Sequence, residues 1–138
     1  MEKLPNLIDV LPKVINHLNL EPNIKLTEHI SAAEILKPGD KGQMSAHKIW
    51  VPANVEYPPH THPSAHVIMV LDGGGYMKLV DNEKITEEAL KPGDMFFVPG
   101  NVAHQVGADK RGLIMIAVSV DSKELTDPDR LKVIDKLL

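Results

Sequence analysis

The pattern of apolar and polar positions divides the chain into a long β-rich region and two shorter helical ends. Between residues 24 and 120, short segments of alternating or continuous apolar character are separated by turn signals rich in glycine, proline, aspartate and asparagine. The predicted strands are residues 24–30, 43–51, 65–71, 75–80, 95–98, 104–106 and 113–120. Many short strands without long helices between them are typical of an all-β sandwich or barrel.

Each end of the chain has the spacing of an amphipathic helix. Apolar residues recur at steps of three and four within residues 1–20, where Pro12 predicts a kink or a break into two short helices. Near the C-terminus, Asp127 is a suitable N-cap and Pro128 suits the first position of a helix over residues 127–138. We expect both helices to pack on the barrel or on a second subunit.

The length and composition fit one domain. The 138 residues contain no linker and no low-complexity segment, so residues 1–138 are expected to form a single unit with its barrel over residues 24–120. Cysteine is absent, which excludes disulfides, zinc–thiolate sites, iron–sulfur clusters and cysteine nucleophiles. This suits a reducing cytoplasm, where we expect the protein to be located.

The charge and hydropathy of the chain limit the classes of partner that it can bind. A net charge of −4 argues against nucleic acid, which requires a concentrated basic face. The longest apolar run, residues 113–118, is six residues long and too short to cross a membrane. A small molecule is therefore the expected ligand.

Four histidines carry the candidate chemistry. His60 and His62 are two residues apart, which on an extended segment places both imidazoles on one face about 7 Å apart. His66 opens an apolar strand, and His104 follows the strand at 95–98 and a Pro-Gly-Asn turn. These side chains can converge on one metal ion, whereas the remaining histidines, His17, His29 and His47, are interpreted as structural or exposed.

Imidazole ligands limit the choice of metal. Four neutral histidines suit manganese, iron, cobalt, nickel, copper or zinc, and they do not suit magnesium or calcium, which prefer oxygen ligands. An octahedral ion with four protein ligands keeps two positions for substrate, water or dioxygen. Because no carboxylate lowers the charge, such an ion is expected to be a strong Lewis acid.

These residues resemble the two sequence motifs of the cupin superfamily. The series His60-x-His62-x3-His66-x6-Gly73 has the spacing of the first motif, with His66 in the place of the usual glutamate. Asn54 stands where that motif opens with glycine, a mild change because asparagine tolerates left-handed turns.

The second motif is present in a degraded form. Gly93-x5-Pro99-x-Asn101-x2-His104 keeps its spacing, but Asn101 replaces a glycine and Ala108 stands where the motif closes with asparagine. The two motifs together cover residues 54–108.

The resemblance implies a fold, a site and an assembly. The fold is a double-stranded β-helix, also called a jelly-roll barrel, and the implied ligands of one divalent transition metal ion are His60, His62, His66 and His104. Small cupins of this kind are expected to form homodimers. The chain looks like the four-histidine subset, which is associated with manganese, copper or iron and, in some members, with oxidative cleavage of carbon–carbon bonds. The missing glutamate argues against oxalate chemistry.

Three functions are compatible with this interpretation. The first is a dioxygenase-like enzyme acting on a small organic substrate. The second is a redox-neutral, metal-dependent isomerase, lyase or hydrolase, and the third is a non-enzymatic module that binds or senses a small molecule. Glu56 and Tyr57 precede the histidines and are expected near the mouth of the barrel. Strand alternation predicts an apolar cavity lined by Trp50, Ile68, Val70, Met77, Phe97 and Met115.

Overall fold

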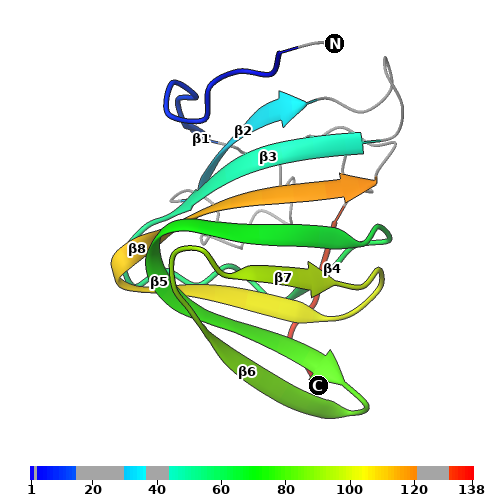
Figure 1. Cartoon of the computed structure of the whole chain (residues 1–138). Coiled ribbons are helices and arrows are strands. Elements are labelled where there is room, and N and C mark those ends of the chain that lie inside the picture. The colour runs from blue at the N-terminus through cyan, green and yellow to red at the C-terminus, as the bar shows by residue number, and fades with distance from the viewer. Residues whose placement is uncertain (2, 15–29, 37–43, 121–130) are drawn as a thin grey trace.

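The regular structure of the described residues is entirely β. The computed structural model describes residues 1, 3–14, 30–36, 44–120 and 131–138 (Figure 1). Its strands are β1 (Lys13–Val14), β2 (Ser31–Leu36), β3 (Met44–Val51), β4 (His60–Thr61), β5 (His66–Asp81), β6 (Lys84–Leu90), β7 (Met95–Val98), β8 (His104–Val120) and β9 (Lys132–Val133). The predicted all-β fold is therefore confirmed. No helix in these ranges is long and apolar enough to cross a membrane.

Strands β5 and β8 belong to two sheets at once. They pair antiparallel over nearly their whole lengths, and both curve sharply at the left of Figure 1. Beyond the curve on one side, the order is β1-β2-β3-β8-β5-β7; on the other side it is β9-β4-β8-β5-β6. The two layers enclose the core between them.

Glycine makes the curve possible. Gly73 has φ 79° and Gly112 has φ 73°, a region that residues with a side chain rarely adopt. A Cβ on Gly73 would lie only 2.0 Å from the carbonyl oxygen of Gly112. The run Asp72–Gly75, expected to be a turn between two strands, is therefore a bend within β5.

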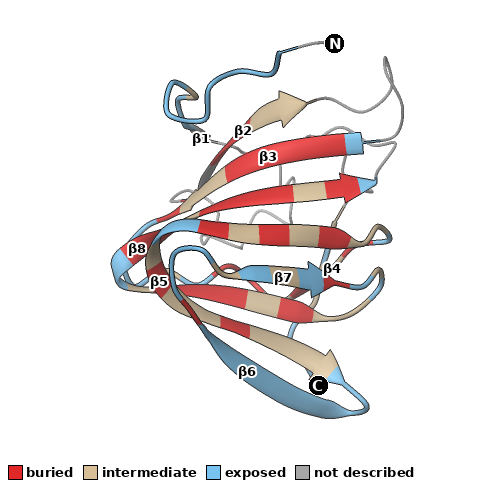
Figure 2. Ribbon diagram, in the orientation of Figure 1, coloured by how far each residue is buried: buried red, intermediate tan, exposed pale blue. Residues whose placement is uncertain are grey.

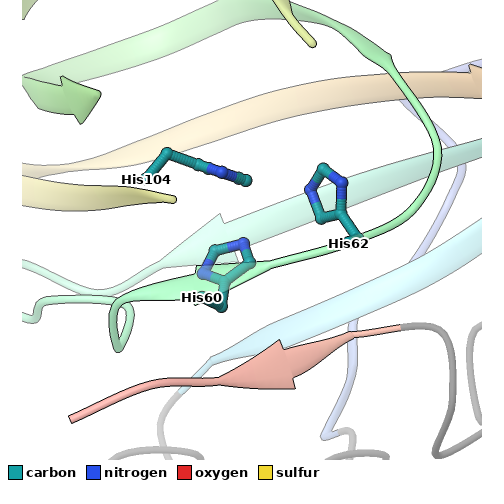
Figure 3. Close-up of side chains that lie close together, drawn as sticks. All are labelled: His60, His62 and His104. Atoms are coloured by element: carbon teal, nitrogen blue, oxygen red, sulfur yellow. The ribbon is translucent and has the colours of Figure 1, made fainter. Parts of the chain in front are cut away.

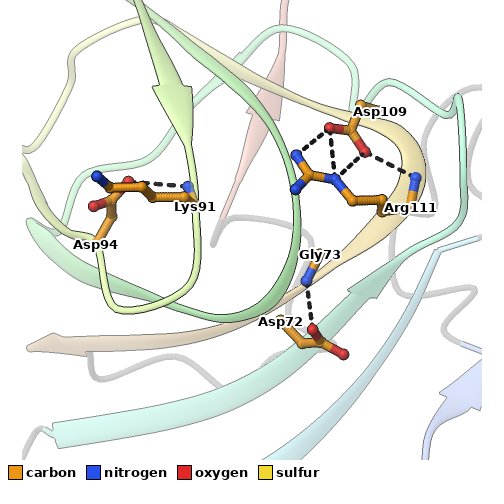
Figure 4. A network of polar contacts seen from close by, with 6 residues as sticks. All are labelled: Asp72, Gly73, Lys91, Asp94, Asp109 and Arg111. Carbon is orange, nitrogen blue, oxygen red and sulfur yellow. Dashed lines mark hydrogen bonds and ion pairs between the residues drawn. The ribbon is translucent and has the colours of Figure 1, made fainter.

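Side chains stabilise the turns around this bend (Figure 4). The Asp72 carboxylate accepts a 2.8 Å hydrogen bond from the Gly73 amide. The Asp109 carboxylate accepts bonds from both the Arg111 amide, at 2.8 Å, and the Arg111 guanidinium, at 2.6 Å. At the Lys-Pro-Gly-Asp turn of residues 91–94, the Asp94 carboxylate accepts a 2.9 Å bond from the Lys91 amide.

The predicted terminal helices are wrong where the structure describes these segments. Residues 3–14 contain a turn and strand β1, and β9 in the C-terminal segment pairs with β4. Pro5 and Pro12 each remove a backbone donor, which disfavours a helix between them, and strand pairing overrides the weak helical pattern of the tail. The rest of the two predicted helices, residues 15–20 and 127–130, lies outside the described residues.

Five of the described strands, β1, β2, β4, β6 and β9, are not predicted from the sequence, and the two longest of them show why. In β6 every residue except Leu90 is exposed, so the strand shows no apolar alternation, and β2 is rich in alanine, glutamate and leucine, which favour helices. Asn82 and Glu83 connect β5 to β6 with φ 49° and 61°, as a two-residue hairpin requires. Of the predicted strand at 24–30, only Ile30 is described.

The core lies on the inner faces of the two layers, where buried and less buried residues alternate (Figure 2). Of the predicted lining residues, Ile68, Val70, Met77 and Met115 are buried. The prediction that Phe97 lines the cavity is wrong, because this residue is 66% exposed and pairs with Val67 on the outer face. Its neighbour Phe96 pairs with Ile68 and packs on the core instead.

The sixth predicted lining residue, Trp50, is also on the outer face. It lies between inward-facing residues of β3 and pairs with Ile114. The Lys48 ammonium lies 4.9 Å from the centre of its ring.

Candidate metal centre

Three buried histidines converge at one end of the barrel. The ring nitrogens of His60, His62 and His104 that face one another all lie within 4.8 Å (Figure 3), and the three side chains are 2–7% exposed. His60 and His104 are direct partners in the pairing of β4 with β8, so their side chains point to the same side. Their ring centroids are 4.2 Å apart.

His66 lies next to this group but does not belong to it. It opens β5, is 7% exposed and faces inward in line with Ile68 and Val70, as alternation predicts. Its ring centroid is 3.7 Å from that of His62. The structure thus brings three of the four predicted ligands into one cluster and places the fourth against His62.

Backbone carbonyls orient all four imidazoles. The Nδ1 atoms of His60 and His104 lie 2.8 and 2.9 Å from the carbonyl oxygens of Pro58 and Val102. The carbonyl oxygen of Ser64 is 2.9 Å from Nδ1 of His62 and 3.0 Å from Nδ1 of His66. Because a carbonyl can only accept, each Nδ1 carries the proton and donates it. Nε2 is then the unprotonated nitrogen, which is the form that a metal ion requires.

Backbone hydrogen bonds hold the segment that precedes β4 against β8. The sequence alone could not predict them. The Tyr57 amide donates to the Val106 carbonyl at 2.7 Å, and the Asn54 amide donates to the Asp109 carbonyl at 3.0 Å. Asn54 and Asn101 have φ 59° and 60°, so each asparagine adopts the left-handed conformation that the family motif assigns to glycine.

The two polar residues expected near the mouth differ in position. Tyr57 is 8% exposed, and its ring centroid is 4.8 Å from that of His60. Glu56 is exposed and lies on the outer face, where its carboxylate accepts hydrogen bonds from the Tyr76 hydroxyl and from the side-chain amide of Gln105. Only Tyr57 is therefore part of the surroundings of the histidines.

Burial keeps two of the three clustered histidines neutral. Desolvation lowers the pKa of His60 well below its ordinary value, and the neighbouring His104 lowers it further. Desolvation also lowers the pKa of His104. Both imidazoles are therefore neutral at neutral pH, with Nε2 free of a proton and able to coordinate a metal.

This neutrality makes the metal-free protein sensitive to acid. The unfolded chain protonates its histidines near pH 6.5, whereas folding keeps His60 and His104 neutral to lower pH. Below pH 6.5 the unfolded state therefore binds more protons, and the free energy of unfolding falls by up to about 1.4 kcal/mol per pH unit for each histidine. Urea unfolding of chelator-treated protein between pH 7.5 and 5.5 measures this slope. We expect a shallower slope for His104→Leu, and an equal slope would contradict this explanation.

Residues 49–121, more than half of the chain, match the family model of the cupin domain. The chain belongs to the cupin family. Among curated proteins, this cupin is 34% identical to germin-like protein 9-2 of Oryza sativa subsp. japonica over 87 residues, which are 61% of this chain and 40% of that protein. The cupin thus spans less than half the length of the germin-like proteins it matches.

Solved structures show the same fold at low sequence identity. The polyketide cyclase RemF from Streptomyces resistomycificus superposes with a TM-score of 0.71 at 21% identity, over 97% of this cupin and 86% of the cyclase. Oxalate decarboxylase from Bacillus subtilis gives 0.67 at 13% identity, over 76% of this cupin and 27% of that chain. At these identities the likeness is one of fold alone.

Proposed function

We propose that this cupin binds one divalent transition metal ion through His60, His62 and His104, with His66 as a fourth ligand, and uses it to activate a small organic molecule. The observation that carries the proposal is the shared orientation of the imidazoles, whose Nδ1 atoms all donate to backbone carbonyls. A donor set of neutral imidazoles fits manganese, iron, cobalt, nickel, copper or zinc.

The residues around the site have separable roles. The carbonyls of Pro58, Ser64 and Val102 hold the histidines in the metal-binding tautomer. Tyr57 and the neighbouring apolar core exclude water from one side of the cluster. A bound divalent ion would supply Lewis acidity and positions for a substrate.

Two reaction classes are candidates. Oxygenation of an electron-rich substrate follows from the all-histidine ligand set, as in the four-histidine cupins that this sequence resembles. A redox-neutral reaction is the second class, because it needs only the Lewis acidity of a bound ion; one protein of the same fold is a polyketide cyclase. We therefore propose metal-dependent activation as the function, with dioxygen as the co-substrate in the first class only.

The two classes differ in their need for oxygen and for a redox-active metal. The experiment compares iron-, manganese-, copper- and zinc-loaded protein with β-diketone, flavonol and polyketide-like substrates, in air and without oxygen. Oxygen uptake with iron, manganese or copper and none with zinc supports the oxygenase. Turnover without oxygen in the zinc form supports the redox-neutral enzyme. If no form turns over any substrate, the enzymatic proposal loses its support.

A further inference from the structure

The turn before His104 lies directly against the loop that follows β4. The Asn101 amide donates a 2.7 Å hydrogen bond to the carbonyl of His62. Gly100 approaches the same loop so closely that a Cβ on it would lie 2.2 Å from the carbonyl oxygen of Pro63. These contacts join the segments that carry His62 and His104.

The reason for glycine at position 100 is space. Gly100 is not among the residues with positive φ, so its backbone conformation is accessible to alanine. The nearest atoms to an added Cβ are all backbone, in Pro63 and Ser64, and backbone cannot turn aside as the end of a side chain can. An alanine would have to displace the loop by roughly 1 Å to restore an ordinary carbon–oxygen contact.

The displaced segment contains the acceptor on which two histidines depend. The carbonyl of Ser64 follows that of Pro63 by one peptide and accepts from Nδ1 of both His62 and His66. A metal site tolerates errors of only about 0.5 Å in the positions of its ligands.

We propose that Gly100 is a positioning residue for the metal centre, because its lack of a side chain lets the 98–101 turn set the place of the Ser64 carbonyl and hence the orientation of His62 and His66. This inference rests on the proposed metal binding. It explains the close contact between the two motif segments as a requirement for positioning the histidines.

The test uses the full-length protein loaded with Co²⁺, whose visible absorption reports ligand geometry. Gly100→Ala is expected to weaken Co²⁺ binding roughly 10- to 100-fold, as the loss of a hydrogen-bond partner of a metal ligand does. We also expect it to change the shape of the absorption bands. Gly74→Ala is the matched control, because its Cβ would meet first the movable end of the Arg111 side chain at the bend of the barrel. We expect that variant to keep the wild-type affinity and spectrum.

The outcomes separate this inference from the proposed function. If wild-type protein does not bind Co²⁺, the proposed function fails. If the wild type binds Co²⁺ and Gly100→Ala matches it in affinity and spectrum, the positioning role is wrong.

A second measurement needs no variant, in case Gly100→Ala does not fold. Hydrogen exchange of the Asn101 amide in wild-type protein is expected to slow at least tenfold when Zn²⁺ binds, because that amide connects the turn to His62. Unchanged exchange of this amide on Zn²⁺ binding would overturn the inference.

Discussion

His104→Leu is expected to reduce metal affinity more than about 100-fold. This exceeds the loss caused by removing a hydrogen-bond partner of a metal ligand. His104 is 2% exposed and pairs directly with His60, so it supplies one of three converging nitrogens. Leucine fills the buried space without a polar group, so the metal-free protein should still fold. Competitive titration with Zn²⁺ or Co²⁺ and a chelator measures the change.

Two other histidines provide the comparison for this result. His47→Leu removes a buried histidine from β3, outside the cluster, and should leave affinity within about threefold of the wild type. His66→Leu should cause a loss intermediate between the two, because the His66 ring lies against that of His62 but is not one of the three clustered residues. Equal affinities for His104→Leu and wild-type protein would exclude His104 as a ligand.

Gly73→Ala is expected to destabilise the metal-free protein by about 3 kcal/mol or more. The new Cβ would combine an unfavourable φ of 79° with a distance of 2.0 Å to the carbonyl oxygen of Gly112. The strained φ and the close contact both lie in the bend through which β5 and β8 enter the second layer. Neither strand can therefore relax without the other. Urea unfolding at pH 7.5 measures the loss.

Gly93→Ala isolates the steric part of this effect. Gly93 also has a positive φ, 92°, but an added Cβ there meets nothing within 4 Å. It should therefore lose only the conformational cost, roughly 1–2 kcal/mol. If the two variants lose the same stability, the clash at the bend is not significant.

The sequence predicts the strands that are rich in apolar and β-favouring residues and misses those that are very short, polar or rich in helix-favouring residues. Met95–Val98 is predicted with its observed bounds and β3 to within one residue, because apolar, β-favouring residues bounded by turn signals mark them. Strand β6 is exposed on both faces and leaves no such pattern. Phe96 and Phe97 are adjacent aromatic residues, so composition alone could not show which one faces inward; only pairing with His66 and Ile68 fixes the register.

The sequence predicts which residue types form the site, but it predicts only part of their geometry. The spacing of His60 and His62 is local, so the sequence contains it. The orientation of the rings depends on backbone carbonyls such as that of Ser64, which have no sequence signature. The identity of the metal, the place of His66 among its ligands, the homodimer and the cytoplasmic location stay predictions.

The metal content of the protein tests most directly whether these histidines form a metal centre. Protein purified without added metal and without a histidine tag can be examined by elemental analysis and by anomalous diffraction at the absorption edge of the metal found. We predict one transition metal ion per chain, coordinated by Nε2 of His60, His62 and His104. Protein that binds no such ion there, even after exposure to each of manganese, iron, cobalt, nickel, copper and zinc, would contradict the account.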